Sequence, residues 1–334
     1  MRASPAVLVI AACGGHVLPP SAAPPAITIV VSEVGALGAK LVVLDEHGDR
    51  RGELLAPADT KVAEKSPAIS PDGKQIVFES SRGGGTSLWI APLAYDAVPT
   101  RLTSGAVDAH PVWTPDGTAI VFERATAQHF DLYRLTLADQ RLEQLTSGPD
   151  DEVTATIARD GTIYYCAKSE HEAHLERRTP DGTVTRITDG PADTAPALSP
   201  DGNWLAFSRP VEHHATLDGE LWLYELASGR AAPLVDVPVA DESGPVWSPD
   251  GAYLFATSVV RSVESGATLF SSVIAVDMAT HHVRLLQDRS GYIPRLTPAV
   301  APHALDRAAL AADPEYVPAL ARIVTKAVAE QQQR

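Results

Sequence analysis

Cysteine is almost missing from this 334-residue chain, which contains only Cys13 and Cys166. Two cysteines exclude both a disulfide-built scaffold and a four-cysteine zinc site. Basic residues are also scarce, since 27 Lys and Arg stand against 42 Asp and Glu, giving a formal net charge of -15. This balance argues against a groove that neutralises nucleic-acid phosphates and against electrostatic binding to an anionic membrane surface. We therefore expect no nucleic-acid partner.

The apolar run at the N-terminus, residues 5–12, is too short to span a bilayer, which needs roughly 20 residues. Because it follows the positively charged Met1-Arg2, it predicts a signal peptide over residues 1–12. The small residues before Cys13 resemble the lipobox of bacterial lipoproteins, with a plain signal peptide and a chance cysteine as the alternative. The resemblance implies lipid attachment at Cys13, and Gly14 after it favours the outer membrane.

Proline and glycine are abundant instead, with 27 and 23 residues, which excludes a helical bundle and indicates many turns. Residues 13–26 predict a Pro-rich tether. Beyond it, Asp-Gly pairs recur in matching contexts, with spacings of 44, 44, 41 and 49 residues. They begin at Asp72, Asp116, Asp160, Asp201 and Asp250. Four of the five read Ser/Thr-Pro-Asp-Gly, which predicts hairpin turns, and the spacing is near that of a four-stranded propeller blade.

Alternating apolar residues on both sides of each turn predict two strands, and two further strands follow in each unit. Residues 27–55 hold three strand-like runs without an innermost strand, while residues 292–297 copy the start of a unit. These fragments complement each other. We therefore predict an all-β fold, a six-bladed propeller of four-stranded blades over residues 27–303, closed by a clasp of N- and C-terminal strands. Five blades with an independent N-terminal hairpin are the alternative.

The last residues, 304–334, predict a short helical tail. A stripe of apolar residues falls on one face of a helix over residues 318–332. The stripe consists of Leu320, Ile323, Val324, Ala327 and Val328. Such a face either packs on the propeller or binds a partner.

The repeat itself resembles that of a known family. Residues 101–105 (Arg-Leu-Thr-Ser-Gly), then Asp108 and the unit through Phe122, are similar to the propeller repeat of TolB, the periplasmic component of the Tol-Pal system. The similarity covers residues 27–298, and related repeats occur in prolyl oligopeptidase-type enzymes. TolB carries an α/β domain before its propeller, whereas this chain has only the tether there. The resemblance therefore implies the propeller alone, on the periplasmic side of the cell envelope.

The connections that lead into each unit are acidic, and we predict that they form a partner-binding face. The candidate residues are Asp108, His110, Asp150, Asp151, Glu152, Asp193, Asp241 and Glu242. A ring of carboxylates around a channel mouth attracts a cation, a basic partner or a peptide amine. The alternative is a set of solvated loops in which Asp serves the turns.

Enzymatic chemistry has little support in the sequence. It contains no Gly-x-Ser-x-Gly nucleophile elbow, and the 36 residues after Pro298 are too few for an α/β-hydrolase domain. We predict a non-catalytic, monomeric interaction module of the cell envelope, held at the membrane only by its lipid, without cofactor, for a protein or peptide partner. A small-molecule or metal-binding propeller enzyme of hydrolase or lyase type, with its site in the central channel, is the alternative. A structural calcium ion there stays open, because carboxylates alone can hold calcium.

Overall fold

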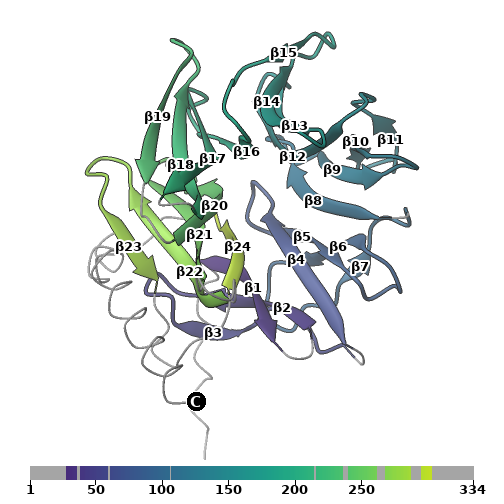
Figure 1. Cartoon of the computed structure of the whole chain (residues 1–334). Helices are drawn as coiled ribbons and strands as arrows, with labels where there is room; N and C mark the ends of the chain where they lie inside the picture. The colour runs from purple at the N-terminus through teal and green to yellow at the C-terminus, as the bar shows by residue number, and fades with distance from the viewer. Residues whose placement is uncertain are drawn as a thin grey trace, which may run out of the picture.

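The computed structural model of the chain describes residues 28–35, 38–58, 61–105, 107–213, 216–235, 240–261, 268–286 and 295–302. Every regular element within these ranges is a β-strand, and the strands form a propeller (Figure 1). The described ranges hold no helix that is long and apolar enough to cross a membrane. The predicted signal peptide, Cys13, the tether and the helical tail lie outside the described residues.

Four separate sheets share one antiparallel, four-stranded plan, in which the chain runs from the innermost strand outward. The first two sheets consist of β8 (Asp108–Trp113), β9 (Ala119–Ala125), β10 (Phe130–Thr136) and β11 (Leu142–Gln144), then β12 (Asp151–Ile157), β13 (Ile163–Lys168), β14 (Ala173–Arg178) and β15 (Val184–Arg186). The next two consist of β16 (Thr194–Leu198), β17 (Trp204–His213), β18 (Thr216–Glu225) and β19 (Arg230–Val235), then β20 (Ala240–Trp247), β21 (Tyr253–Arg261), β22 (Thr268–Asp277) and β23 (Val283–Leu286).

The remaining strands form one eight-stranded sheet made of two four-strand groups. Its first group comprises β24 (Arg295–Val300), β1 (Ile29–Gly35), β2 (Gly38–Leu44) and β3 (Arg50–Glu53). Its second comprises β4 (Val62–Ile69), β5 (Gln75–Ser80), β6 (Ser87–Pro92) and β7 (Thr100–Arg101). A short parallel ladder between β2 and β4 joins them. The described strands thus form five sheets, whereas the sequence predicts six separate blades.

The two ends of the propeller are joined by antiparallel pairing of β24 with β1. Ile29 lies opposite Val300 and Glu33 lies opposite Arg295. This pairing confirms the predicted contact between a C-terminal strand and the N-terminal strands. The described part of this strand begins at Arg295, and residues 292–294 of the predicted segment lie outside the described residues.

The repeated turns explain why the inner hairpins form where they do. In the first of them, Gly73 has φ +69 and donates its N–H to the Ser70 carbonyl at 2.9 Å, while Ser70 Oγ donates to Asp72 at 2.7 Å. The aspartate also accepts the N–H of Lys74. The turns at Asp116, Asp201 and Asp250 repeat this aspartate hydrogen bonding. Each turn sequence therefore fixes the hairpin that follows it.

Every inner strand of the repeats also carries a bulge, at which its pairing with the next strand shifts register. One residue at each bulge has a positive φ, between +43 and +62. These residues are Ser66, His110, Thr154, Ala195 and Gly244. A bulge bends its strand and redirects a side chain. The repetition places five such bends around the centre of the ring.

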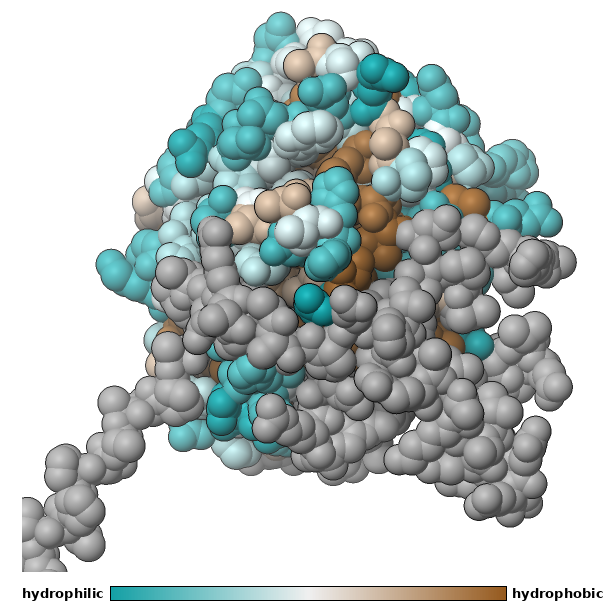
Figure 2. Space-filling view, turned by 90° about the vertical axis from the view of Figure 1, so that its left-hand side faces the viewer, coloured by the Kyte–Doolittle hydropathy of each residue, from teal (hydrophilic) through white to brown (hydrophobic). Residues whose placement is uncertain are grey.

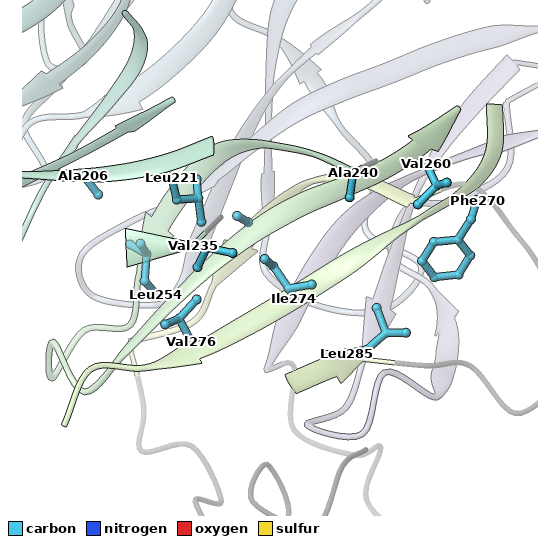
Figure 3. Close-up of a cluster of buried hydrophobic side chains, with 11 residues drawn as sticks. Ala206, Leu221, Val235, Ala240, Leu254, Val260, Phe270, Ile274, Val276 and Leu285 are labelled. Carbon is cyan, nitrogen blue, oxygen red and sulfur yellow. The ribbon is translucent and has the colours of Figure 1, made fainter. Parts of the chain in front are cut away.

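The hydrophobic core lies between neighbouring sheets. Figure 3 shows one such layer, where Leu221 of β18 packs with Leu254 of β21 and Ile274 of β22, all fully buried. A second layer joins Phe122 of β9 to Val77 of β5. Because burying one such side chain contributes roughly 1.5–3 kcal/mol, these layers hold the sheets together face to face.

Candidate functional site

A central channel of about 460 Å³ is the main cavity on the propeller axis. Its lining comes from the inner strands β4, β8, β12, β16, β20 and β24. The walls are mostly Pro, Ala, Val, Ile, Leu and Trp side chains. Among the described lining residues, His110 alone can carry a charge. The channel therefore offers apolar surface with a single ionisable group.

His110 occupies the bulge of β8, where its φ is +43. Its imidazole is half exposed, and Nδ1 lies 3.0 Å from Glu123 Oε2. Burial lowers the pKa of His110, but the hydrogen bond and charge of Glu123, together with the charge of Glu79, outweigh it and raise the pKa to about 9. The imidazole is therefore protonated at neutral pH and presents a cationic hydrogen-bond donor to the channel.

The two glutamates behind His110 are buried, and Glu123 links β8 to the inner strand of the next sheet. Glu79 accepts the hydroxyl of Ser66 at 2.9 Å, within its own sheet. Glu123 accepts the backbone N–H of Thr154 at 2.6 Å, in the next sheet. His110 therefore sits on a preformed hydrogen-bonded support, which holds its ring in place.

Four of the predicted partner-binding acids turn out to be buried. Asp108, Asp193 and Glu242 are 0% exposed and Glu152 is 5% exposed. Asp108 makes a two-pronged ion pair with Arg124, at 2.7 and 2.9 Å, and Asp193 makes the same pair with Arg209, at 2.6 and 2.8 Å. Both carboxylates are thus buried and engaged in ion pairs within the fold.

The paired arginines are held by aromatic rings as well as by carboxylates. The guanidinium of Arg124 lies 5.3 Å from the ring centres of both Phe122 and Tyr133. That of Arg209 lies 5.2 Å from Phe207 and 4.3 Å from Trp222. Such contacts add cation–π attraction to the ion pair. The aspartate, arginine and rings together pin the start of the inner strand to the end of its neighbour.

Glu152 departs from this pattern, because its cross-strand position offers no paired arginine. Ala167 lies opposite Glu152 in β13, and the exposed Lys168 lies opposite Asp151. Burial, a hydrogen bond with Asp131 and the charge of Asp131 raise the pKa of Glu152 to about 8. At neutral pH this carboxyl group is therefore mostly protonated, and it joins β12 to β10 of the preceding sheet.

Three predicted residues remain partly accessible near the starts of the inner strands: Asp150, Asp151 and Asp241. Asp151 accepts the N–H of Phe130 at 2.8 Å. Asp241 lies 3.0 Å from Arg261. Together with half-exposed His110 they form the accessible part of the predicted face. Among the described residues, no three His, Cys, Asp or Glu side chains lie close enough to hold a metal ion.

The sequence analysis missed the arginines that bury the acidic residues. The signal was present, since Arg124 follows Asp108 by 16 residues and Arg209 follows Asp193 by 16. In a hairpin of this length, those positions face each other, as Asp108 and Arg124 do in the register of β8 and β9. Cys166 is buried, and burial raises the pKa of its thiol to about 12.

Comparison with known proteins identifies the repeat. The sequence matches the family described as TolB beta propeller domain over residues 17–249, more than half of its length. The chain belongs to the TolB beta propeller family. The match runs through the inner strands from β4 to β20 and so includes most of the channel lining.

Relatives in this family are distant. The Tol-Pal system protein TolB of Francisella tularensis subsp. holarctica is 25% identical over 232 residues, which cover 54% of this chain and 53% of the relative. An uncharacterized protein of Agrobacterium fabrum is 25% identical over 214 residues, covering 61% of this chain and 73% of its own. This chain spans about half the length of the Francisella protein.

Solved structures agree on the architecture. The crystal structure of TolB from Acinetobacter baumannii superposes with a TM-score of 0.67 and 19% sequence identity, covering 82% of this chain and 66% of that protein. At this level of identity the similarity concerns the fold alone. It supports the propeller arrangement of the described strands.

Proposed function

We propose that this chain is a non-catalytic interaction module of the cell envelope, comparable in character to the Tol-Pal system, which binds a protein or peptide partner at its channel. The membership in the TolB beta propeller family carries this proposal, together with a channel that has apolar walls and a single cationic donor. Surfaces of this kind accommodate apolar side chains and fix their orientation with few polar groups.

We further propose that the propeller has six blades. The channel lining draws on six inner strands, and β24 completes a four-strand group with β1, β2 and β3. The pairing of β24 with β1 also shifts register, between Leu296 and Ala299, as the other five inner strands do. On this view the ladder between β2 and β4 is an addition that links two blades.

The partner is proposed to approach from the side on which the inner strands begin. Asp150 and Asp151 lie at the start of β12 and Asp241 lies at the start of β20, whereas His110 lines the channel. With a net charge of -15, the chain attracts basic segments over long range, which accelerates their encounter. Once bound, a carbonyl or carboxylate of the partner accepts a hydrogen bond from His110.

Location is proposed from the sequence. Residues 1–12 act as a signal peptide, Cys13 carries the lipid, and residues 13–26 link it to the propeller, which places the module on the periplasmic side with the outer membrane favoured. We propose a monomer. We favour the interaction module over the enzymatic alternative because, among the described residues, one histidine and no carboxylate lines the channel.

The proposal is tested by photo-crosslinking in intact envelopes of a bacterium that expresses the full chain. The photoreactive residue benzoylphenylalanine replaces Asp150 at the channel entrance or, as the control, Val98. Val98 is 74% exposed and lies between β6 and β7, on the face of the Asp-Gly turns. We expect a defined protein adduct from position 150 and none of the same mass from position 98. Equal labelling from both positions would contradict docking at the entrance.

A further inference from the structure

A second cavity, of about 640 Å³, lies between the β16–β19 sheet and the β20–β23 sheet. Its walls include Pro200, Trp204, Leu223, Pro233, Leu234, Trp247 and Met278. Trp204 is 37% exposed. Figure 2 faces the side of the molecule on which β19 and β23 lie and shows apolar surface open between hydrophilic areas. We call this cavity the seam groove.

The propeller supplies its own comparison for the seam groove. The equivalent cavity between the β8–β11 and β12–β15 sheets measures about 360 Å³. It contains the cross-strand pair Arg134 and Glu143, where the seam groove has the pair Leu223 and Ala232. Two charged side chains therefore narrow one cavity, while small and apolar ones leave the other open.

The seam groove opens on the face of the Asp-Gly turns. It is bounded by the turns at Asp201 and Asp250. The connection between β18 and β19 and the connection between β22 and β23, which contains His281, complete its rim. The last described residue, Pro302, lies on this same face, against the turn at Gly73. The chain beyond Pro302 therefore starts on the side where the groove opens, opposite the channel entrance.

We propose that residues 318–329 of the same chain occupy the seam groove. The apolar stripe predicted there (Leu320, Ile323, Val324, Ala327 and Val328) matches the apolar walls, as an amphipathic helix matches a hydrophobic groove. The 15 residues from 303 to 317 span up to about 50 Å when extended, which is ample reach.

Charge favours this occupant over a second acidic surface. The segment 318–329 carries two charged residues, Arg322 and Lys326, both basic. The rim of the groove carries three carboxylates, Asp201, Glu225 and Asp250, against Arg230 and His281. On a helix, Lys326 borders the apolar stripe beside Ile323 and its long side chain can reach the acidic rim, whereas Arg322 falls on the opposite face with Ala329. The docked segment closes the Asp-Gly face and leaves the channel entrance free for the partner.

The test uses disulfide formation in the full chain with Cys13→Ser. Ala232 is exposed in the groove, and Cys166 does not interfere because it is buried with a raised thiol pKa. One variant combines Ala232→Cys with Ala327→Cys, on the apolar stripe. The matched control combines Ala232→Cys with Ala329→Cys, on the opposite face of the predicted helix.

Under mild oxidation we expect the 232–327 pair to close within one chain at least about ten times faster than the 232–329 pair, because a disulfide needs Cα atoms roughly 4.4–6.8 Å apart. Equal rates would overturn the proposal. A dominant disulfide-linked dimer would overturn it too, by assigning the groove to a second copy.

A second measurement does not depend on the geometry of one cysteine pair. This measurement is the quenching of tryptophan fluorescence by acrylamide. The contribution of Trp204 is the difference in quenching between a chain with Trp204 and the same chain with Trp204→Phe. We expect Leu320→Asp with Val324→Asp to raise that contribution about twofold, and Thr325→Asp with Ala329→Asp to leave it unchanged. Quenching that is the same in all three chains would show that the segment does not cover Trp204.

Discussion

At the scale of single residues, the buried pair of Asp108 and Arg124 serves stability and leaves nothing for a partner. Asp108→Asn leaves Arg124 charged without its counterion, so we expect the free energy of unfolding to fall by about 3 kcal/mol. Asp150→Asn, at a partly exposed position of the same acidic set, should change it by less than about 0.5 kcal/mol. Urea denaturation measures both. If Asp108→Asn lowers the free energy of unfolding no more than Asp150→Asn does, the structural role of Asp108 is contradicted and Asp108 is again a candidate docking residue.

Glu152 makes the molecule sensitive to pH. Folding raises the pKa of this carboxyl from 4.5 to about 8, so between these values the folded chain holds a proton that the unfolded chain releases. Stability should therefore fall as pH rises through this window, and Glu152→Gln should remove that part of the slope. Thermal unfolding at a series of pH values measures it.

The control for Glu152 is Glu143→Gln, whose side chain is 47% exposed and forms an ion pair with Arg141 at the surface. The comparison is made between pH 4.5 and 6.5, because His110 adds a slope of the same sign above 6.5, as its raised pKa of about 9 is passed. A wild-type slope that survives in Glu152→Gln would show that this carboxyl titrates normally.

At the scale of elements, the turn at Gly38 and the ladder between β2 and β4 join the first two strand groups. Gly38 has φ +125, and a Cβ there would lie against the carbonyl oxygen of Val62. Gly38→Ala should therefore lower the free energy of unfolding by more than about 1 kcal/mol. Gly35→Ala, in the same hairpin with open space around it, is the control. Equal effects in urea denaturation would mean that the ladder is dispensable.

The repeats made these elements predictable in large part. Turn residues such as Pro71 and Gly73 act through local backbone geometry, so the hairpins could be located from the sequence, as could the pairing of the two chain ends. The ladder between β2 and β4 could not be located from the sequence, because only two residue pairs form it and no sequence pattern in either strand marks them. The burial of Asp108 could have been predicted, because Arg124 follows it by 16 residues and faces it across the hairpin.

His110 shows the limit of the prediction at the site. The sequence places it in an acidic connection, which is compatible with any surface role. Its cationic character arises from Glu79 and Glu123, which come from two other strands. Such a cluster depends on how the sheets pack around the axis, and no spacing along one strand encodes it.

At the scale of the whole molecule, the lipid anchor at Cys13 is a prediction with a direct readout. Expressed with its own leader in a bacterium, the chain should incorporate labelled palmitate and sediment with membranes. Cys13→Ser should lose the label while the propeller still folds, because Cys13 lies outside the described propeller strands. Labelling of Cys13→Ser equal to that of the wild type would contradict anchoring at this residue.

The most direct measurement of partner docking in the channel compares the adduct yield from benzoylphenylalanine at position 150 in the wild-type background and in His110→Asn. Asparagine tolerates the positive φ of this position, so the bulge is kept while the cationic donor is lost. We predict a yield about ten times lower in His110→Asn, as expected when a charge-assisted hydrogen bond to the partner is removed. An unchanged yield, with unfolding also unchanged, would contradict docking at the channel.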